Sequence, residues 1–287
     1  MAETKVIIVG CGDLGSEVAR QLTRLGIKTI GVRRGVESIR DKDTIQGLEI
    51  IPADVTQPVT LVVLGAIRPE IIVYCVAAGG QSDAEYKSAY VDGLRNVLAT
   101  QKNNTRLKHV FFASSTRVYG QETDSLLDES VPPIPADFGG QRLLEAERLM
   151  QTLSCNGTAL RLSGIYGPGR LRMLNLAKTP GNWPRQNTWS NRIHRDDAAA
   201  FITFLIQQAL AGAALQACYI VTDSRPVAQY EVLGWLAAQF HVNQPKLIAV
   251  SGGKRLSNLA LLATGFRLQY PDYQTGYQSL LSQFTVQ

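Results

Sequence analysis

A glycine-rich turn near the start of the chain limits most strongly what this sequence can fold into. Residues 9–15 read Val-Gly-Cys-Gly-Asp-Leu-Gly, which contains the pattern G-x-G-x-x-G. The apolar run Lys5–Val9 precedes this turn and predicts a fully buried strand. Apolar residues then recur at helical spacing from Leu14 to Leu25, and a glycine follows as a stop signal. A strand, a tight turn and a helix in this order predict the first half of a βαβ unit.

The same alternation of short apolar runs and amphipathic segments continues to about residue 160. It predicts a parallel sheet covered by helices on both faces, that is, an α/β Rossmann fold with a doubly wound sheet and a small C-terminal α/β lobe. We expect a dinucleotide-binding domain over 1–160 and a smaller substrate lobe over 161–287, interleaved with it. Loops are expected over Gln121–Phe138 and Gly164–Asn191. The expected further strands are Thr29–Val32, Leu48–Ile51, Ile71–Val76, Val110–Ala113, Thr158–Leu162 and Cys218–Val221, and the clearest later helices are Gln141–Leu153 and Tyr230–Phe240.

Composition excludes several classes of function. The four cysteines are far apart and form no metal-ligand spacing, so we expect reduced thiols, no metal site and a cytoplasmic protein. The net charge is +5, but no dense run of Lys and Arg points to nucleic acid. The uncharged stretch 198–222 is interrupted by glutamines and a glycine, so no membrane span is expected. The first apolar run is too short for a signal peptide.

The glycine turn has the chemistry of a dinucleotide site. Gly10 allows the sharp turn, Gly12 lets the backbone approach a pyrophosphate, and Gly15 allows close packing of helix on strand. The N–H groups at the start of the helix favour the phosphates. The alternative is a sheet of this type that binds no ligand. The predicted pyrophosphate-binding residues are Gly10, Cys11, Gly12, Asp13, Leu14 and Gly15.

The end of the second strand indicates which dinucleotide is bound. An acidic residue at this point binds the ribose 2′-hydroxyl of NAD, but this chain has Arg33 and Arg34, which suit the 2′-phosphate of NADP. We therefore favour NADP over NAD, and the alternative is a pair of solvated surface arginines. Asp54 and Val55 follow the third strand, where a carboxylate can accept a hydrogen bond from the adenine amino group.

Four segments in order resemble the extended short-chain dehydrogenase/reductase family, the NAD-dependent epimerase/dehydratase group. Tyr90–Leu98 is similar to the family's helix beside the sheet, and Phe111–Gly120 to its active-site serine loop. Arg161–Gly169 resembles the segment that lines the nicotinamide pocket, and Asn191–Asp197 the start of a late helix. The resemblance covers nearly the whole chain. It further assigns to the cofactor site Ala77, Ala78, Ser114, Arg142, Gly164 and Ile165.

The resemblance also shows where the family's catalytic centre is changed. The family uses a serine or threonine, a tyrosine that moves a proton, and a lysine four residues later. Ser115 matches the serine, but Phe138 stands for the tyrosine and Arg142 for the lysine. Phenylalanine has no proton to give, whereas arginine keeps the charge that could hold the ribose. Val9 also replaces the first glycine of the family's longer pattern.

Two explanations of this degenerate centre stay open. In the first, Tyr119, Tyr166, His194 or a bound water supplies the proton, and the chain is a redox or isomerase-type enzyme. Each of these three side chains has a plain alternative as a packing or helix-start residue. In the second explanation, the chain is a non-catalytic NADP(H)-binding regulatory or scaffold protein.

The arginines and tryptophans of the later chain suggest a substrate class. If several arginines face a cleft, the substrate is a small anionic, nucleotide-sugar-like metabolite on which Trp183 or Trp189 could stack. The alternative is a basic surface with two tryptophans that bury a loop. The family often dimerises, so we expect a homodimer by analogy. The arginines are Arg161, Arg170, Arg172, Arg185, Arg192 and Arg195.

Overall fold

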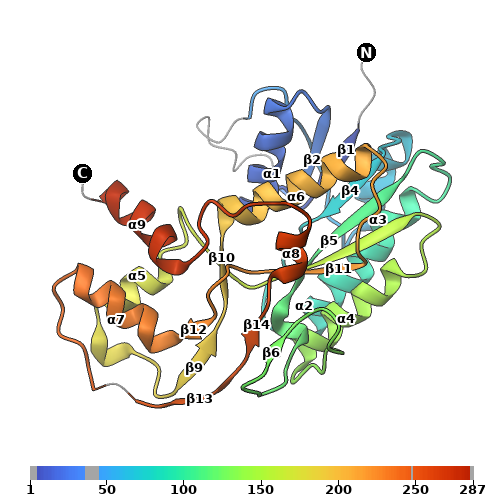
Figure 1. Cartoon of the computed structure of the whole chain (residues 1–287). Coiled ribbons are helices and arrows are strands. Elements are labelled where there is room, and N and C mark those ends of the chain that lie inside the picture. The colour runs from blue at the N-terminus through green and yellow to red at the C-terminus, as the bar shows by residue number, and fades with distance from the viewer. Residues whose placement is uncertain (1–4, 36–44, 247, 285–287) are drawn as a thin grey trace. The chain divides into compact units, whose positions relative to one another are not determined.

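The computed structural model describes residues 5–35, 45–246 and 248–284. The first four residues, part of the segment in which no signal peptide is expected, lie outside the described residues. The centre of the fold is a seven-stranded sheet with the strand order β11-β7-β5-β4-β1-β2-β3 (Figure 1). This confirms the predicted α/β Rossmann fold. The strands are β1 (Val6–Val9), β2 (Thr29–Arg33), β3 (Glu49–Pro52), β4 (Ile71–Tyr74), β5 (His109–Ser115), β7 (Asn156–Leu162) and β11 (Cys218–Val221).

The apolar runs form strands because both faces of the sheet are covered. All four residues of β1 are buried, as are all four of β4. Val9 pairs in parallel register with Val32 on one side and with Tyr74 on the other. A strand buried on both faces has no solvent side, which explains continuous apolar runs in place of alternation.

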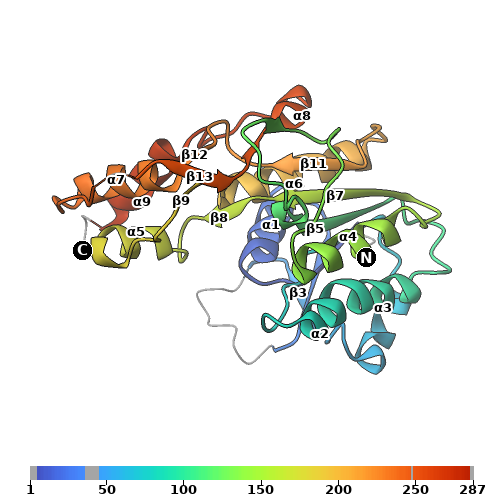
Figure 2. The same ribbon diagram turned by 90° about the horizontal axis from the view of Figure 1, so that it is seen from below.

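Helices cover the two faces of this sheet. Helix α1 (Asp13–Arg24) lies on one face and buries Val18 and Leu22, whereas α3 (Gly93–Thr100) and α4 (Phe138–Met150) lie on the other (Figures 1 and 2). The strand order reverses between β1 and β4, and ligands of such sheets bind beyond the carboxyl ends of the strands at this point. The remaining helical segments here are η2 (Pro58–Ala66), α2 (Asp83–Tyr86), η3 (Lys87–Asp92) and η4 (Thr116–Val118).

The chain divides into two compact units. Unit 1 consists of residues 1–119, 135–161 and 199–219, and unit 2 of 120–134, 162–198 and 220–287. The domain limits 1–160 and 161–287 stay a prediction.

Unit 2 contains short elements in a segment expected to be a loop. The loop expected over Gly164–Asn191 was wrong, because this segment holds β8, α5, η5 and β9. The loop expected over Gln121–Phe138 likewise contains the two-residue strand β6, which pairs with β14. Outside unit 1 lie β6 (Leu126–Leu127), β8 (Gly164–Tyr166), α5 (Arg172–Ala177), η5 (Pro180–Asn182), β9 (Asn187–Ser190), β10 (Arg192–His194), β12 (Val227–Ala228), α7 (Gln229–Gln239), β13 (Val250–Gly253), β14 (Arg255–Leu256), α8 (Leu259–Ala263) and α9 (Tyr273–Phe284), while α6 (Arg195–Leu210) begins in unit 2 and ends in unit 1.

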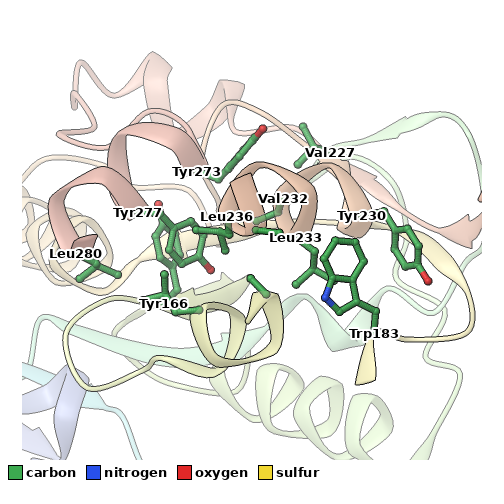
Figure 3. Close-up of a cluster of buried hydrophobic side chains, with 13 residues drawn as sticks. Tyr166, Trp183, Val227, Tyr230, Val232, Leu233, Leu236, Tyr273, Tyr277 and Leu280 are labelled. Carbon is green, nitrogen blue, oxygen red and sulfur yellow. The ribbon is translucent and has the colours of Figure 1, made fainter. Parts of the chain in front are cut away.

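An aromatic cluster forms the core of unit 2 (Figure 3). The rings of Tyr166 and Tyr277 are stacked with centroids 4.4 Å apart. Trp183 meets Tyr230 edge to face at 5.2 Å, and its indole N–H donates to the carbonyl oxygen of Leu176. This packing explains why a segment of low periodicity is ordered: its short elements are held by aromatic side chains from distant parts of unit 2.

Within the described part of the chain, no helix is long and apolar enough to cross a membrane. Nor do the described His, Cys, Asp and Glu side chains form a group of three or more that could hold a metal ion. The four cysteines are free thiols.

Candidate functional site

The sequence-predicted cofactor residues of unit 1 come together along one edge of the sheet. The glycine turn follows β1. Arg33 is the last residue of β2 and Arg34 follows it, and Asp54 comes after β3. Ala77 and Ala78 follow β4, and Ser114 and Ser115 end β5. Because carboxyl ends of parallel strands meet at the same edge, these residues form one continuous candidate site at the reversal between β1 and β4.

The glycine turn has the shape that a pyrophosphate requires. Gly10 has φ +92°, and a Cβ there would lie 2.6 Å from the backbone of Cys75. By contrast, a Cβ on Gly12 would meet nothing within 4 Å. Helix α1 begins after Gly12 with no side chain as its cap. An open position beside an uncapped helix N-terminus fits the phosphates of a dinucleotide.

The other residues of the turn are structural. Cys11 is buried, and a Cβ on Gly31 would lie 2.9 Å from its Sγ. Burial raises the pKa of the Cys11 thiol, so it is a neutral packing group. Leu14 and Gly15 are buried against the sheet, whereas Asp13 is exposed.

Arg34 and Asp54 follow β2 and β3, the two strands on one side of β1. The Arg34 Nη1 atom lies 4.0 Å from the position that a Cβ on Gly79 would take, so this guanidinium reaches the loop after β4. The Asp54 Oδ1 atom accepts hydrogen bonds from the main-chain N–H and the hydroxyl of Thr56 at 2.9 and 2.8 Å. The Asp54 carboxylate is thus held in one orientation.

Two predicted site residues belong to a buried polar network. The Ser114 hydroxyl donates to Glu147 Oε1 at 2.5 Å, and Arg161 Nη2 donates to Glu147 Oε2 at 2.7 Å. Arg161 Nη1 donates to the hydroxyl of Tyr119 at 2.5 Å. Burial opposes the charged guanidinium, but the Glu147 carboxylate outweighs it and raises the pKa of Arg161. The network joins β5, α4 and β7 beneath the candidate site; Tyr119 as a proton donor stays a prediction.

Ser115 and the two changed positions are also in unit 1. The Ser115 Oγ accepts a hydrogen bond from the main-chain N–H of Arg117 at 3.2 Å. Phe138 is the first residue of α4 and packs against Tyr86. Arg142 donates to both carboxylate oxygens of Asp83 at 2.7 and 2.8 Å and to Glu145 at 2.8 Å. The carboxylates of Asp83 and Glu145 therefore bind the Arg142 guanidinium, the positive charge that by the family resemblance would bind the ribose.

Unit 2 brings together the other two candidate proton donors. Strands β8 and β10 pair in parallel, with Tyr166 opposite His194, and the two rings meet edge to face at 5.3 Å. The Tyr166 hydroxyl lies 3.5 Å from the carbonyl oxygen of Asp272, and burial raises its pKa. Burial lowers the pKa of His194 to about 4, so this imidazole is neutral at pH 7. Both side chains are in a packed interior, and their catalytic roles stay predictions. The cofactor residues Gly164 and Ile165, on the same strand β8, stay predictions as well.

Two of the six candidate arginines are buried, Arg161 and Arg192. Trp183 is also buried, and its N–H already has a main-chain acceptor. Arg170, Arg172 and Arg185 are exposed, whereas Trp189 and Arg195 are half-buried, and Arg195 donates to Asp196.

Sequence reasoning missed Glu147, Arg117 and Tyr86. The pairing of Glu147 with Arg161 joins residues 14 positions apart, and that of Arg117 with Tyr86 joins residues 31 apart. Such separations match no helical or strand period. The one available signal was Glu147 within the predicted Gln141–Leu153 helix, since a charge on a core-facing side must be paired.

Comparisons with known proteins identify the family of this chain. The model of the NAD dependent epimerase/dehydratase family matches residues 6–218. A solved structure from Methylobacillus flagellatus with the same family description is 48% identical, covers 99% of this chain and 100% of its own, and has a TM-score of 0.88. The UDP-glucose 4-epimerase of Thermus thermophilus, solved with NAD, is 18% identical with a TM-score of 0.74; the match covers 95% of this chain and 96% of the epimerase, and at this identity it shows the fold.

A curated relative matches part of the chain. The UDP-glucose 4-epimerase of Mycoplasma genitalium is 30% identical over 141 residues, which is 45% of this chain and 41% of the relative. This chain thus matches less than half of that relative's length. The family model extends over most of the described chain and includes the glycine turn, the Ser115 loop and Arg142. The chain therefore belongs to the NAD-dependent epimerase/dehydratase family.

Proposed function

We propose that this chain is an NAD(P)-dependent enzyme of the redox or isomerase type that acts on a small anionic, nucleotide-sugar-like metabolite. The observation that carries the proposal is the glycine turn, with open space at Gly12 beside the uncapped start of α1. Two relatives described as UDP-glucose 4-epimerases support the substrate class. One of them was solved with NAD, which supports a nicotinamide cofactor.

The proposed cofactor is NADP. Arg34 is exposed and lies beside Gly79, where a guanidinium can pair with a 2′-phosphate. Arg33, half-buried at the end of β2, adds a second positive charge. NAD is the alternative, because it lacks only that phosphate.

Each part of the site has a distinct task in this proposal. The turn residues bind the pyrophosphate, and Asp54 offers its carboxylate to the adenine amino group. The bound nicotinamide supplies hydride transfer. Ser115, whose Oγ accepts from the main chain, keeps its own hydroxyl hydrogen for a substrate oxygen. In unit 2, the exposed Arg170 and Arg172 carry positive charge that attracts anions, the class to which the proposed substrate belongs.

A second candidate function follows from the changed catalytic positions. Phe138 has no hydroxyl, and the charge of Arg142 is held by Asp83 and Glu145. A chain with this centre could bind NADP(H) as a regulatory or scaffold protein without turning it over.

We also expect a homodimer, which sedimentation would reveal as twice the chain mass.

The two functions are separated by incubating the NADP⁺-loaded and the NAD⁺-loaded protein with UDP-glucose or UDP-galactose. The enzyme proposal expects conversion of one sugar nucleotide into a product that proton NMR resolves. Tight dinucleotide binding with no change in any sugar nucleotide tested would favour the non-catalytic candidate. A sample without dinucleotide serves as the control.

A further inference from the structure

Phe138 packs against a different tyrosine of unit 1. The rings of Tyr86 and Phe138 meet edge to face with centroids 5.5 Å apart. Tyr86 ends α2 and Phe138 begins α4, and these helices lie side by side in both views (Figures 1 and 2). Tyr86 thus places a phenol ring beside Phe138, the position at which the family has its catalytic tyrosine.

Arg117 fixes the hydroxyl of Tyr86. Its Nη1 donates to the Tyr86 oxygen at 2.7 Å, while Nε and Nη2 each donate to the carboxylate of Asp137 at 2.9 Å. Its Cζ lies 5.0 Å from the ring centre of Tyr86 and 5.4 Å from that of Phe138. A Cβ on Gly139 would lie 2.4 Å from this Cζ, so the glycine leaves the space that the guanidinium fills.

This geometry leaves the Tyr86 proton available. A guanidinium only donates, so the Tyr86 oxygen must be the acceptor in this hydrogen bond. The phenol proton therefore points elsewhere, and among the described residues its acceptor is the Gln81 side-chain oxygen at 3.3 Å. That bond is long and Gln81 is exposed, so a substrate oxygen can replace it.

Ser115 is linked to Arg117 as well, through the main chain. The main-chain N–H of Arg117 donates to Ser115 Oγ, while its side chain donates to Tyr86. Arg117, in η4 directly after β5, therefore contacts a serine through its main chain and a tyrosine through its positively charged side chain. These are the three chemical functions that proton transfer beside a nicotinamide requires.

We propose that Tyr86, oriented by Arg117, is the proton-transferring phenol of this chain. The proposal rests on the proposed function, because it assigns a residue to the same site. In the reducing direction, Tyr86 gives its proton to the oxygen of a ketone while the carbonyl carbon takes a hydride from the reduced dinucleotide. The ketone becomes an alcohol, and the phenolate left behind accepts the hydrogen bond from Arg117. In the oxidising direction, the same oxygen takes the proton of the substrate hydroxyl.

The first test needs no substrate. N-acetylimidazole acylates accessible tyrosine hydroxyls, and mass spectrometry locates the modified residues. We expect Tyr86 to be acylated in the protein alone and about tenfold more slowly when nine tenths of the protein holds NADP⁺, because the dinucleotide covers this hydroxyl. Tyr86 is itself largely buried, with 8% of its surface exposed; Tyr74, which is fully buried and donates its hydroxyl hydrogen to the carbonyl oxygen of Ala89, is the unreactive control. A Tyr86 hydroxyl that never reacts, or reacts equally fast with NADP⁺ bound, overturns the proposal.

The second test measures proton transfer directly. Protein loaded with NADP⁺ or NAD⁺ is mixed with UDP-glucose or UDP-galactose, and nicotinamide reduction is followed in a single turnover. Tyr86→Phe should lower this rate by about 10²–10⁴-fold with an unchanged dinucleotide Kd. Tyr219→Phe, which removes a hydroxyl elsewhere in unit 1, should leave the rate unchanged.

Variants of Arg117 test its positioning role in the same assay. Arg117→Lys keeps a donor and should recover part of the rate that Arg117→Met loses, with the loss in the maximal single-turnover rate and not in the sugar-nucleotide concentration that gives half of it. A Tyr86→Phe protein that reacts at the wild-type rate overturns the proposal. A wild-type protein that reacts with neither sugar contradicts the proposed function alone, and the acylation experiment then decides on Tyr86.

Discussion

At the scale of single residues, the arginines of this chain differ in what their surroundings leave them able to do. Arg161 is buried against Glu147, Arg142 is held by two carboxylates, and Arg117 is fixed to Asp137 and Tyr86. Arg34 is exposed beside Gly79. In the sequence these four arginines are equivalent cations. Only their neighbours in the folded chain show whether an arginine stabilises the fold, orients another side chain or is free to contact a ligand.

We propose that Arg33 and Arg34 select NADP. In the double variant Arg33→Ala, Arg34→Ala we expect NADP⁺ affinity to fall about 10- to 100-fold, since charged hydrogen bonds contribute about 1.5–3 kcal/mol. NAD⁺ affinity should stay the same, because NAD⁺ has no 2′-phosphate. Fluorescence titration of both dinucleotides measures this, and an unchanged NADP⁺ Kd would contradict the assignment.

Removing Glu147 should strongly destabilise unit 1. Glu147→Ala leaves the Arg161 guanidinium buried without its counter-charge and takes the acceptor from Ser114, which should lower the free energy of unfolding by about 3–5 kcal/mol. The matched control is Glu145→Ala on the same helix, whose partner Arg142 is partly exposed. For Glu145→Ala the free energy of unfolding should fall by less than about 1 kcal/mol. Equal losses in urea denaturation would refute the role of the buried network.

At the scale of elements, the sequence predicts the long strands and helices well and the short ones poorly. The sequence predicts β5 over Val110–Ala113, because a continuous apolar run is typical of a strand that is buried on both faces. In the structure β5 extends over His109–Ser115. Strand β6 has two residues and α5 has six. Elements of this length have no periodicity of their own, and distant side chains such as Trp183 hold them in place.

Within the turn from β1 to α1, two glycines should respond in opposite ways. Gly10→Ala forces a side chain onto φ +92° and against Cys75, so stability should fall by more than about 1–3 kcal/mol. Gly12→Ala meets open space, so stability should hardly change, but its methyl group takes the place of the pyrophosphate and dinucleotide affinity should fall. Thermal unfolding with and without NADP⁺ separates the two. A Gly12→Ala protein that binds NADP⁺ normally would place the ligand elsewhere.

At the scale of the whole molecule, buried imidazoles make stability depend on pH. Burial lowers the pKa of His109 in unit 1 to about 4 from the ordinary 6.5. Between these values the unfolded chain binds a proton that the folded chain does not, so this contribution is complete above pH 6.5 and is lost as the pH falls toward 4. Asp223 in unit 2, whose pKa burial raises to about 7, has the opposite sign: its contribution is lost as the pH rises.

The effect of His109 can be isolated by substitution. From about pH 7 to about pH 5 we expect the wild-type protein to lose up to about 1.4 kcal/mol per pH unit more than His109→Asn, which keeps a polar side chain opposite Thr158 without a titratable ring. Urea denaturation at each pH gives both slopes. Equal slopes would mean that His109 binds its proton equally well in the folded and the unfolded chain, which contradicts the lowered pKa.

The edge of the candidate site was more predictable than its centre. The turn, the arginine pair and Asp54 follow strands directly, so the order of elements along the chain places them. The grouping of Tyr86, Arg117 and Ser115 depends on how α2 and η4 approach each other, and no local pattern encodes that approach.

The most direct test of the account is calorimetric titration of the protein with NADP⁺, NADPH, NAD⁺ and NADH in turn. We predict tight binding of NADP⁺ and NADPH and weaker binding of NAD⁺ and NADH, because the glycine turn receives the pyrophosphate and Arg34 the 2′-phosphate. Absence of heat with all four would mean that the turn beside α1 is not a dinucleotide site.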